Sequence, residues 1–543
     1  MITKEAFKRL RGSAPAPDQV LLTLKGDPAR MRAVRWRTDV TVTEGFVLLR
    51  PAGSAGRERR VEAERAVFVT DMDESAFWFA DLTGLEPDTA YEYTVGDVSR
   101  RAGPYRFRTE RANCERFSFL CLSDFQTGGP EPPADYTGVG EFIRETLRRH
   151  PECAFILTAG DNTNCGQTDI QWTGLFEGLR GIVESVPLML CMGNHDDMGF
   201  EDYFTFRGKY YSEHAEYFTH MLRGSYPLNG PPGWETANYF FDYGDARFFV
   251  LGTSGYAEMN DWLVSSAARC EKTWKIAVHH FPVCYAGPEI ECEDTWPALS
   301  AGMDRCDLVF SGHEHSFARS YPRRGDGLYD APSRGAVHYN LGSGARNPPG
   351  TRVVKKLWNA KTYAHEEPLS MYTVATVEGA RCTLAAYLED GRVIDRCVID
   401  RAADRIDPPD PAPMFLRPRL AFKGYDLGVV CAQTPPRRID GVWYVPAGAP
   451  VSFIGGSVVR SPGRIRVEVY GRFAEFAENS DTALTSAGAL KMAGPCLRLD
   501  CGQLYVPAAD LCAPLRMHPL YFERNGFISI ESETEQRPVP EQP

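Results

Sequence analysis

The sequence predicts a multidomain protein with an N-terminal all-β sandwich, a central α/β layered domain and a small C-terminal α+β domain. Its 543 residues exceed what one hydrophobic core can organise. Short alternating apolar runs fill the first part, and beyond Thr109 longer apolar runs alternate with segments of helical period. The proline-rich stretch DPPDPAPMF then sets off the last part. We therefore expect a leader (1–17), the sandwich (18–110), the α/β domain (111–401), a linker (402–414), the C-terminal domain (415–533) and a tail (534–543).

The N-terminal part shows the spacing of a β sandwich. Turn residues separate its apolar runs, which are QVLLTL, MRAVRW, AVFVT, AFWFADL and YEYTVGD. The segment LTGLEPDTAYEYTVGD, followed by GPYRFRTE, resembles a fibronectin type III-like domain and places Tyr91 at the position of a tyrosine corner. We expect this domain to be a scaffold.

The central part contains five buried apolar runs that end directly in polar clusters. The runs are FSFLCLS, AFILTA, VPLMLCM, KIAVHH and CDLVFSG, and the clusters are SDFQ, GDNTN, GNHDD, HHFP and GHEH. GEFIRETLRRH and TDIQWTGLFEGLRGIVES have helical period, so an α/β domain is predicted. Open α/β sheets place their active sites at the carboxyl ends of the strands. Further β-like runs, from VHYNLGSG to VIDRCVID, complete the domain near residue 400.

The C-terminal part contains an imperfect internal repeat. GVWYVPAG and GQLYVPAAD each read as a strand that runs into a turn or a helix start. With RNGFISIE, these segments weakly resemble the small domain found at the N-terminus of some copper amine oxidases, over residues 415–533. His518 is the only histidine there, so no copper site is expected. The resemblance implies an interaction or scaffolding role.

Charge and cysteine content narrow the class of protein. The net charge of −12 disfavours binding of nucleic acid through overall charge, but a small phosphorylated substrate remains compatible. The first 17 residues lack an apolar run of signal-peptide length, and no stretch is long enough to span a bilayer. Most of the 15 cysteines lie in apolar runs, which favours buried free thiols over disulfides. We therefore expect a cytoplasmic protein.

The polar clusters together predict a metal centre. Five of the 11 histidines (His195, His279, His280, His313 and His315) fall in three short segments after buried strands. Carboxylate, amide and imidazole groups are the ligand set of Zn, Mn and Fe. In His313-Glu314-His315 an extended backbone points both imidazoles the same way, toward two neighbouring ions. Two ions also need a shared carboxylate, and Asp161 is the candidate.

SDFQ, GDN, GNHD, HHFP and GHEH occur in the order and rough spacing of the calcineurin-like metallophosphoesterases. With the sandwich ahead of them, residues 18–400 resemble a purple acid phosphatase. The resemblance implies a four-layer sandwich, two divalent or trivalent transition-metal ions (Mn, Fe or Zn) and hydrolysis of phosphoric esters. The implied ligands are Asp124, Asp161 and His315 for the first ion, and Asp161, Asn194, His280 and His313 for the second.

Three positions depart from the pattern of the family. Gln126 stands where many members have a histidine ligand, so it either ligates through its amide oxygen or positions a water. Asn164 stands at the position of the tyrosine that colours purple acid phosphatases, so no purple colour is expected. The acidic loop CYAGPEIECED lacks the substrate-binding histidines of plant-type relatives. Acid phosphatase activity on simple monoesters is therefore not implied.

The expected mechanism is in-line attack on phosphorus by a hydroxide that bridges the two metal ions. His195 is the candidate general acid for the leaving group, with Asp196 orienting it, or else a residue that only positions Asn194.

His279 competes with His280 for the ligand role, although strand alternation turns it to the other face. Arg319 and Asn162 are expected near the phosphate or in packing roles. Monoesterase and diesterase or nucleotidase activity stay open, and the alternative is an inactive fold that serves as a binding or surface-attachment protein.

Overall fold

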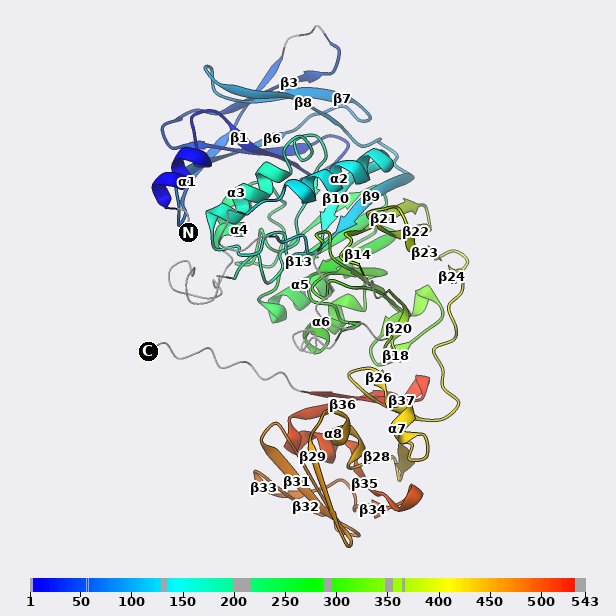
Figure 1. The fold of residues 1–543 in the computed structure, drawn as a ribbon. Coiled ribbons are helices and arrows are strands. Elements are labelled where there is room, and N and C mark those ends of the chain that lie inside the picture. Colours follow the sequence, from blue (N-terminus) through cyan, green and yellow to red (C-terminus); the bar gives the residue numbers. More distant parts are fainter. Residues whose placement is uncertain are drawn as a thin grey trace.

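The computed structural model describes residues 3–54, 56, 58–127, 134–198, 216–287, 295–346, 355–363 and 367–532. In Figure 1 the N-terminal sandwich, the α/β domain and the C-terminal region follow one another from top to bottom. The expected acidic loop lies partly outside the described residues, and the expected tail lies wholly outside them. None of the described helices combines the length and the apolarity that a bilayer crossing requires.

The N-terminal part is a sandwich of two four-stranded sheets, as predicted, in the orders β1-β2-β6-β5 and β4-β3-β7-β8. A helix that the sequence did not suggest, α1 (Lys4–Leu10), precedes it and buries Phe7. The Tyr91 hydroxyl accepts the backbone N–H of Glu86 at 2.9 Å, which confirms the tyrosine corner. The strands are β1 (Asp18–Thr23), β2 (Arg32–Asp39), β3 (Phe46–Pro51), β4 (Arg59–Glu62), β5 (Glu64–Val69), β6 (Glu74–Leu82), β7 (Ala90–Gly96) and β8 (Arg101–Arg108).

The central part contains two seven-stranded sheets. The first has the order β11-β10-β9-β21-β22-β23-β24, and the second has the order β12-β13-β14-β15-β19-β16-β20. The strands of the first sheet are β9 (Arg116–Leu122), β10 (Cys153–Thr158), β11 (Leu188–Met189), β21 (Met371–Glu378), β22 (Arg381–Leu388), β23 (Val393–Asp400) and β24 (Arg405–Asp407). Those of the second are β12 (Tyr239–Tyr243), β13 (Ala246–Leu251), β14 (Trp274–His279), β15 (Leu308–Ser311), β16 (Phe317–Ser320), β19 (Val337–Leu341) and β20 (Asn359–Tyr363).

Helices cover the outer faces of these two sheets, which gives the predicted four layers (Figure 1). Along β13 the side chains alternate: Phe248 packs between the sheets, and Phe249 packs against α5 and α6. The helices are α2 (Thr137–Arg149), α3 (Asp169–Gly178), α4 (Glu216–Leu222), α5 (Tyr256–Ala268) and α6 (Thr295–Met303). Strands β17 (Arg323–Arg324) and β18 (Gly327–Leu328) form a separate small hairpin.

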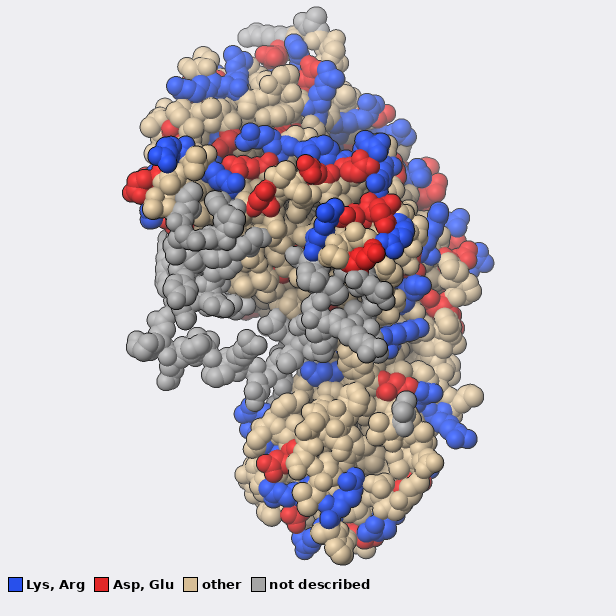
Figure 2. All heavy atoms as spheres, viewed as in Figure 1, with Lys and Arg blue, Asp and Glu red and all other residues tan. Residues whose placement is uncertain are grey.

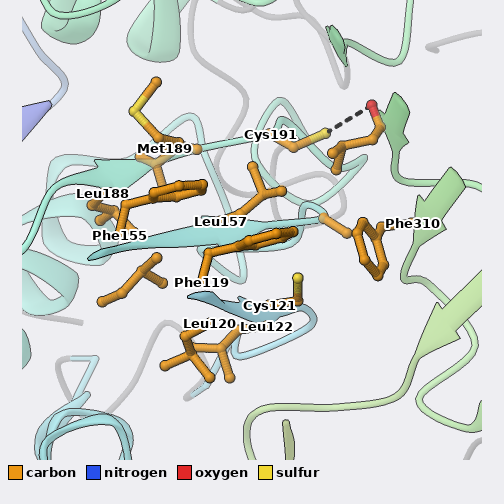
Figure 3. Packing of buried hydrophobic residues seen from close by; sticks show 14 of the residues in the cluster. Phe119, Leu120, Cys121, Leu122, Phe155, Leu157, Leu188, Met189, Cys191 and Phe310 are labelled. Carbon is orange, nitrogen blue, oxygen red and sulfur yellow. Dashed lines mark hydrogen bonds between the residues drawn. The ribbon is translucent and has the colours of Figure 1, made fainter. Parts of the chain in front are cut away.

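Aromatic rings fill the space between the two sheets (Figure 3). The ring of Phe119 from β9 stacks on Phe155 from β10, with centroids 5.1 Å apart. It also meets the edge of Phe310, which comes from β15 in the other sheet. This core holds the carboxyl ends of β9, β10 and β15 at one edge of the domain, where the polar clusters follow.

The C-terminal region consists of three small sheets and short helices. The predicted repeat is confirmed: β28 runs toward α8, β35 runs into α9, and the two strands pair with each other antiparallel. The sheet orders are β26-β25-β37-β36, β27-β28-β35-β34 and β29-β30-β31-β32-β33. The elements are β25 (Arg419–Phe422), β26 (Tyr425–Asp426), α7 (Gly428–Cys431), β27 (Arg437–Ile439), β28 (Val442–Pro446), α8 (Ala449–Phe453), β29 (Ser457–Ser461), β30 (Arg464–Val469), β31 (Arg472–Ala477), β32 (Thr482–Thr485), β33 (Gly488–Lys491), β34 (Leu497–Arg498), β35 (Leu504–Pro507), α9 (Ala508–Cys512), β36 (Met517–Phe522) and β37 (Phe527–Ser532).

The structure shows where the charged side chains and the cysteines of the chain lie. On the face in Figure 2, basic and acidic side chains are interspersed rather than gathered into one basic track. The cysteines of the described residues are free thiols, and all but Cys114 and Cys501 are buried. Burial raises the pKa of the Cys153 thiol to about 12, which keeps it protonated.

Candidate metal centre

The five predicted polar clusters follow strands whose carboxyl ends meet at one edge of the two sheets. Asp124 follows β9 and Asp161 follows β10 in the first sheet. His280 and the pair His313 and His315 follow β14 and β15 in the second. Because β9 and β10 are parallel, and β14 and β15 are parallel, each sheet delivers its polar residues at one end.

The backbone is left-handed at four of the predicted ligands. Asp124 has φ 52°, Asp161 53°, His313 74° and His315 50°. This conformation is uncommon for residues other than glycine, although Asp and His adopt it more often than most. Hydrogen bonds hold it in place: the N–H of His313 donates to both carboxylate oxygens of Asp124, at 2.8 and 2.9 Å.

Three glycines allow the ligands to approach one another. A Cβ on Gly160 would lie 2.5 Å from Nδ1 of His280, and one on Gly193 would lie 2.1 Å from Oδ1 of Asp161. A Cβ on Gly312 would lie 2.5 Å from Oδ2 of Asp124. Each glycine immediately precedes a predicted ligand in the sequence, so the pattern Gly-ligand recurs because the neighbouring loops touch there.

Asp161, His280 and His313 form a compact group of predicted ligands. One ligand atom from each lies within 4.8 Å of the others. Nε2 of His280 lies 2.9 Å from Oδ1 of Asn194 and 3.2 Å from Oδ1 of Asp161. The other ring nitrogen of His280 donates to the carbonyl of Ala159 at 2.8 Å. These four residues are the set predicted for the second ion.

The residues predicted for the first ion lie close to one another and to Gln126. Nε2 of His315 lies 3.7 Å from Oδ1 of Asp124. The amide nitrogen of Gln126 donates to Oδ2 of Asp161 at 3.1 Å and lies 3.2 Å from Nε2 of His315. Gln126 therefore belongs to the centre, and ligation through its oxygen would require the amide to turn over. Oδ1 of Asp161 thus lies beside His280, and Oδ2 is linked to His315 through the Gln126 amide.

The charges in the centre shift the pKa of each group in a direction set by burial and neighbours. Burial alone would lower the pKa of His280, but the Asp161 carboxylate outweighs it and raises the pKa to about 9. Burial would raise the pKa of Asp161, yet His280 and His195 hold it well below its usual range. Burial lowers the pKa of His313 to about 3, so its imidazole is neutral and able to coordinate a cation.

His195 lies at the rim of the centre with 26% of its side chain exposed. Its Nδ1 donates to the carbonyl of Asn164 at 3.0 Å, which leaves Nε2 directed toward the centre, 3.9 Å from Oδ2 of Asp161. Its backbone N–H donates to Oδ1 of Asp161 at 2.9 Å. The imidazole is therefore positioned apart from the ligands, and its backbone supports the shared carboxylate.

The expectation that Asp196 orients His195 is wrong. The Asp196 carboxylate is 1% exposed, and its two oxygens accept five hydrogen bonds from Asn162, Thr163 and Gly193. Burial, with the charge of Asp161, raises the pKa of Asp196 to about 6. The hydrogen bonds of Asp196 join the loop after β10 to the loop after β11. The carbonyl of Asn164, and not Asp196, orients the ring of His195.

Three other residues considered in the sequence have structural partners. His279 points away from the centre, with Nδ1 on the carbonyl of Phe281 and its ring beside Tyr256 of α5. Asn162 donates to the carbonyl of Cys191 and to Asp196. Arg319 is buried between Asp395 and Asp410, so it does not reach the centre as a phosphate contact.

Glu314, which lies between the two histidines of GHEH, was not predicted to have a role. It is 6% exposed, and its carboxylate accepts the backbone N–H groups of Ala286 and Gly287, both at 2.6 Å. Asn340 also donates to it at 3.0 Å. The expected extended backbone is wrong here, because His313 and His315 have positive φ, so strand alternation does not apply to this segment and gave no signal for Glu314.

Comparison with known proteins agrees with this geometry. Residues 117–317 match the model of the calcineurin-like phosphoesterase family, and residues 17–109 match the N-terminal domain of purple acid phosphatases. Purple acid phosphatase 15 of Arabidopsis thaliana is 24% identical over 284 residues, which cover 44% of this chain and 48% of the relative. An uncharacterised protein of Mycobacterium tuberculosis is 24% identical over 388 residues, covering 63% of this chain and 72% of the relative.

The solved structure of purple acid phosphatase PPD1 from yellow lupin seeds has the same fold over much of its length. Its TM-score is 0.58 at 17% sequence identity, with 72% of this chain and 75% of that chain covered. The chain spans about half the length of the Arabidopsis relative. The chain contains a calcineurin-like phosphoesterase domain behind a purple acid phosphatase N-terminal domain, and over these two domains it is similar to purple acid phosphatases.

Proposed function

We propose that the protein hydrolyses phosphoric esters with two metal ions held by Asp124, Asp161, Asn194, His280, His313 and His315. One observation carries the proposal: the Asp161 carboxylate lies between two sets of side chains, with Nε2 of His280 3.2 Å from Oδ1 and the amide of Gln126, which also contacts His315, 3.1 Å from Oδ2. A buried carboxylate in that position suits a ligand that two cations share. Mn, Fe and Zn are all compatible with this mixed donor set.

The donor chemistry of the second group fits a cation. Because a carbonyl only accepts, the bond from Nδ1 of His280 to Ala159 fixes the proton on Nδ1. In the imidazolium form, Nε2 donates to the oxygens of Asn194 and Asp161 at 2.9 and 3.2 Å. A cation that replaced this proton would have the same nitrogen and oxygens as ligands, and the bond to Ala159 is the support that metal-bound histidines commonly have. When bound, the ions would activate a water and neutralise the charge of the phosphoryl oxygens.

The chain itself would supply the proton for the leaving group through His195. The carbonyl of Asn164 holds the ring by Nδ1, so Nε2 carries the transferable proton of the imidazolium form. The partly exposed ring lies beside the centre without being one of the ligands, which suits a general acid. Positioning of Asn194 and Asp161 by the backbone of His195 is a separate role.

The class of ester stays open between phosphomonoesters and phosphodiesters or nucleotides. The alternative function, an inactive fold used for binding or attachment, is less well supported because the predicted ligand positions all hold competent residues. Hydrolysis of paired chromogenic mono- and diesters by the metal-loaded protein, with loss on chelation, separates these possibilities. A protein that is active without metal would contradict the proposed chemistry.

Asp161→Asn tests the shared carboxylate directly. An amide retains one neutral oxygen, so we expect loss of both ions, measured as metal content per chain, and loss of hydrolysis. Asp395→Asn is the matched control, since this buried carboxylate binds Arg319 rather than the centre, and it should keep both ions. If Asp161→Asn retains one ion at normal affinity, Asp161 does not bridge.

A further inference from the structure

Residues 283–287, which we call the support loop, follow the predicted ligand His280 closely in the sequence. The loop is buried from Val283 to Gly287. Glu314, between the predicted ligands His313 and His315, accepts two of its backbone N–H groups, those of Ala286 and Gly287. The loop therefore connects the two strand ends that provide three of the predicted ligands.

The C-terminal region contacts the same loop from the opposite side. The hydroxyl of Tyr285 donates to the carboxylate of Glu531, in β37, at 2.6 Å. Glu531 is 3% exposed, Tyr285 is 3% exposed, and the hydroxyl of Ser529 donates to the other oxygen of Glu531. A carboxylate buried this deeply is stable only with such hydrogen bonds, so the Tyr285–Glu531 pair is specific rather than incidental.

Lys356 closes the contact between the loop and the C-terminal region. Its ammonium group donates to the carbonyl of Gly287 and lies 3.5 Å from the centre of the Tyr285 ring. It also lies 4.9 Å from the ring of Tyr425, which belongs to the C-terminal region. Lys356 is 1% exposed, and a cation–π contact strengthens when it is desolvated.

An apolar cluster surrounds these polar contacts. Trp358 donates from its indole nitrogen to the carbonyl of Tyr285 at 2.9 Å. Phe522 and Phe527 of the C-terminal region stack at 4.3 Å and belong to the same buried cluster as Trp358, Tyr285 and Val283. The interface behind the metal centre is thus a continuous core rather than a hinge.

We propose that Glu531 is a positioning residue of the metal centre, and that the C-terminal region is fused to the phosphoesterase domain to fix the support loop. This rests on the proposed function, because the loop positions ligands of the proposed metals. Glu531 holds Tyr285, Tyr285 belongs to the loop, and Glu314 joins the loop to His313 and His315. Residues that orient ligands from behind commonly change metal affinity or activity about 10–100-fold when they are removed.

Three variants of the full-length protein test the pair. Glu531→Leu removes the acceptor of the Tyr285 hydroxyl, Tyr285→Phe removes the donor, and Glu531→Gln keeps a hydrogen-bonding group of the same shape. We expect the first two to speed the loss of metal to a chelator and to lower kcat on the order of tenfold with little change in KM. Glu531→Gln should restore most of both quantities, and the double variant Tyr285→Phe/Glu531→Leu should be no worse than Glu531→Leu alone.

Asn525→Leu is the matched control at the same interface. Asn525 is a buried C-terminal residue that bonds both backbone groups of Leu328, so it joins the C-terminal region to the hairpin β17–β18 and not to the support loop. Its substitution should lower the thermal midpoint without changing the rate of metal loss. Equal rates of metal loss in Asn525→Leu and Glu531→Leu would overturn the proposal and leave only a stability effect.

Unchanged metal loss and kcat in Glu531→Leu, when the wild-type protein is active, would also overturn the positioning role. A wild-type protein that binds two ions but hydrolyses no ester would instead contradict the proposed function. In that case the rate of metal loss still tests Glu531, because this measurement needs no turnover.

Discussion

Single residues in the centre adopt backbone conformations that the surrounding loops impose. Asp124, Asp161, His313 and His315 all have positive φ, at a cost on the order of 1–3 kcal/mol each. They persist because other groups determine them: Gln126 donates its backbone N–H to the carbonyl of Asp161, and Ser343 donates to the carbonyl of Asp124. The predicted ligand side chains are thereby held toward the centre, which would reduce the reorganisation needed to bind a metal ion.

The role proposed for His195 leads to a prediction that depends on the leaving group. In His195→Ala the backbone N–H still donates to Asp161, so metal content should stay near normal. An alkyl phosphate leaves as a basic alkoxide that needs a proton, whereas nitrophenolate leaves without one. We expect kcat to fall about 10²–10⁴-fold for alkyl esters and clearly less for nitrophenyl esters.

Two outcomes would assign His195 differently. Equal losses on both esters with normal metal content would mean that the ring only positions the substrate. Loss of metal would mean that the imidazole supports the centre through Asp161, from which its Nε2 lies 3.9 Å away.

At the level of elements, the loops after β10 and β11 meet so closely that glycine is required. Gly160 has φ +95°, and a Cβ there would lie 2.5 Å from Nδ1 of His280 and 2.8 Å from the backbone of Gly193. Neither neighbour is the free end of a flexible side chain. A side chain at position 160 would therefore push the loop away from His280.

Gly160→Ala should weaken metal binding in addition to destabilising the fold. Gly181→Ala is the matched control, because Gly181 also has positive φ (+82°) but a Cβ there would meet nothing within 4 Å. Both variants should lose on the order of 1–2 kcal/mol from the backbone conformation. Only Gly160→Ala should lower metal affinity, by tenfold or more, in a competition titration with a chelator. Similar affinities in the two variants would show that His280 does not depend on this close approach.

The same elements show what the sequence could predict. Apolar runs that end in SDFQ, GDN or GHEH predicted both the strands and the edge where their polar residues meet, because burial and alternation are local signals. The long-range partners of Asp196, Arg319 and Glu314 were not predictable from the sequence. These contacts join segments that lie 26 to 91 residues apart, and pairing over such a separation produces no periodic pattern in the sequence. The positive φ angles of His313 and His315 were also not predictable from the sequence.

At the scale of the whole molecule, the three parts share buried interfaces. Phe7 of α1 and Phe77 of the N-terminal sandwich belong to the same core cluster as Phe119 of the α/β domain. Phe522 and Phe527 of the C-terminal region join the cluster under α5 and α6. The proline-rich segment before the C-terminal region is also anchored, since Asp410 binds Arg319 of β16. The expected linker is thus attached to the α/β domain on its way to the C-terminal region.

The anchoring of that segment gives the last prediction, for Asp410→Ala. The guanidinium of Arg319 is 3% exposed and lies between Asp395 and Asp410, so removal of Asp410 leaves part of a buried cation without its partner. Hydrogen bonds to charged groups contribute about 1.5–3 kcal/mol, and we expect a loss of that size in the free energy of unfolding measured with urea.

Asp390→Ala is the matched control: its exposed ion pair with Arg392 should be worth at most about 1 kcal/mol and should weaken with salt. Because Arg319 keeps Asp395 and does not reach the centre, Asp410→Ala should retain normal metal content. A loss in Asp410→Ala no larger than in Asp390→Ala would show that the segment is held by its other contacts, and that the buried ion pair contributes little to joining the two parts.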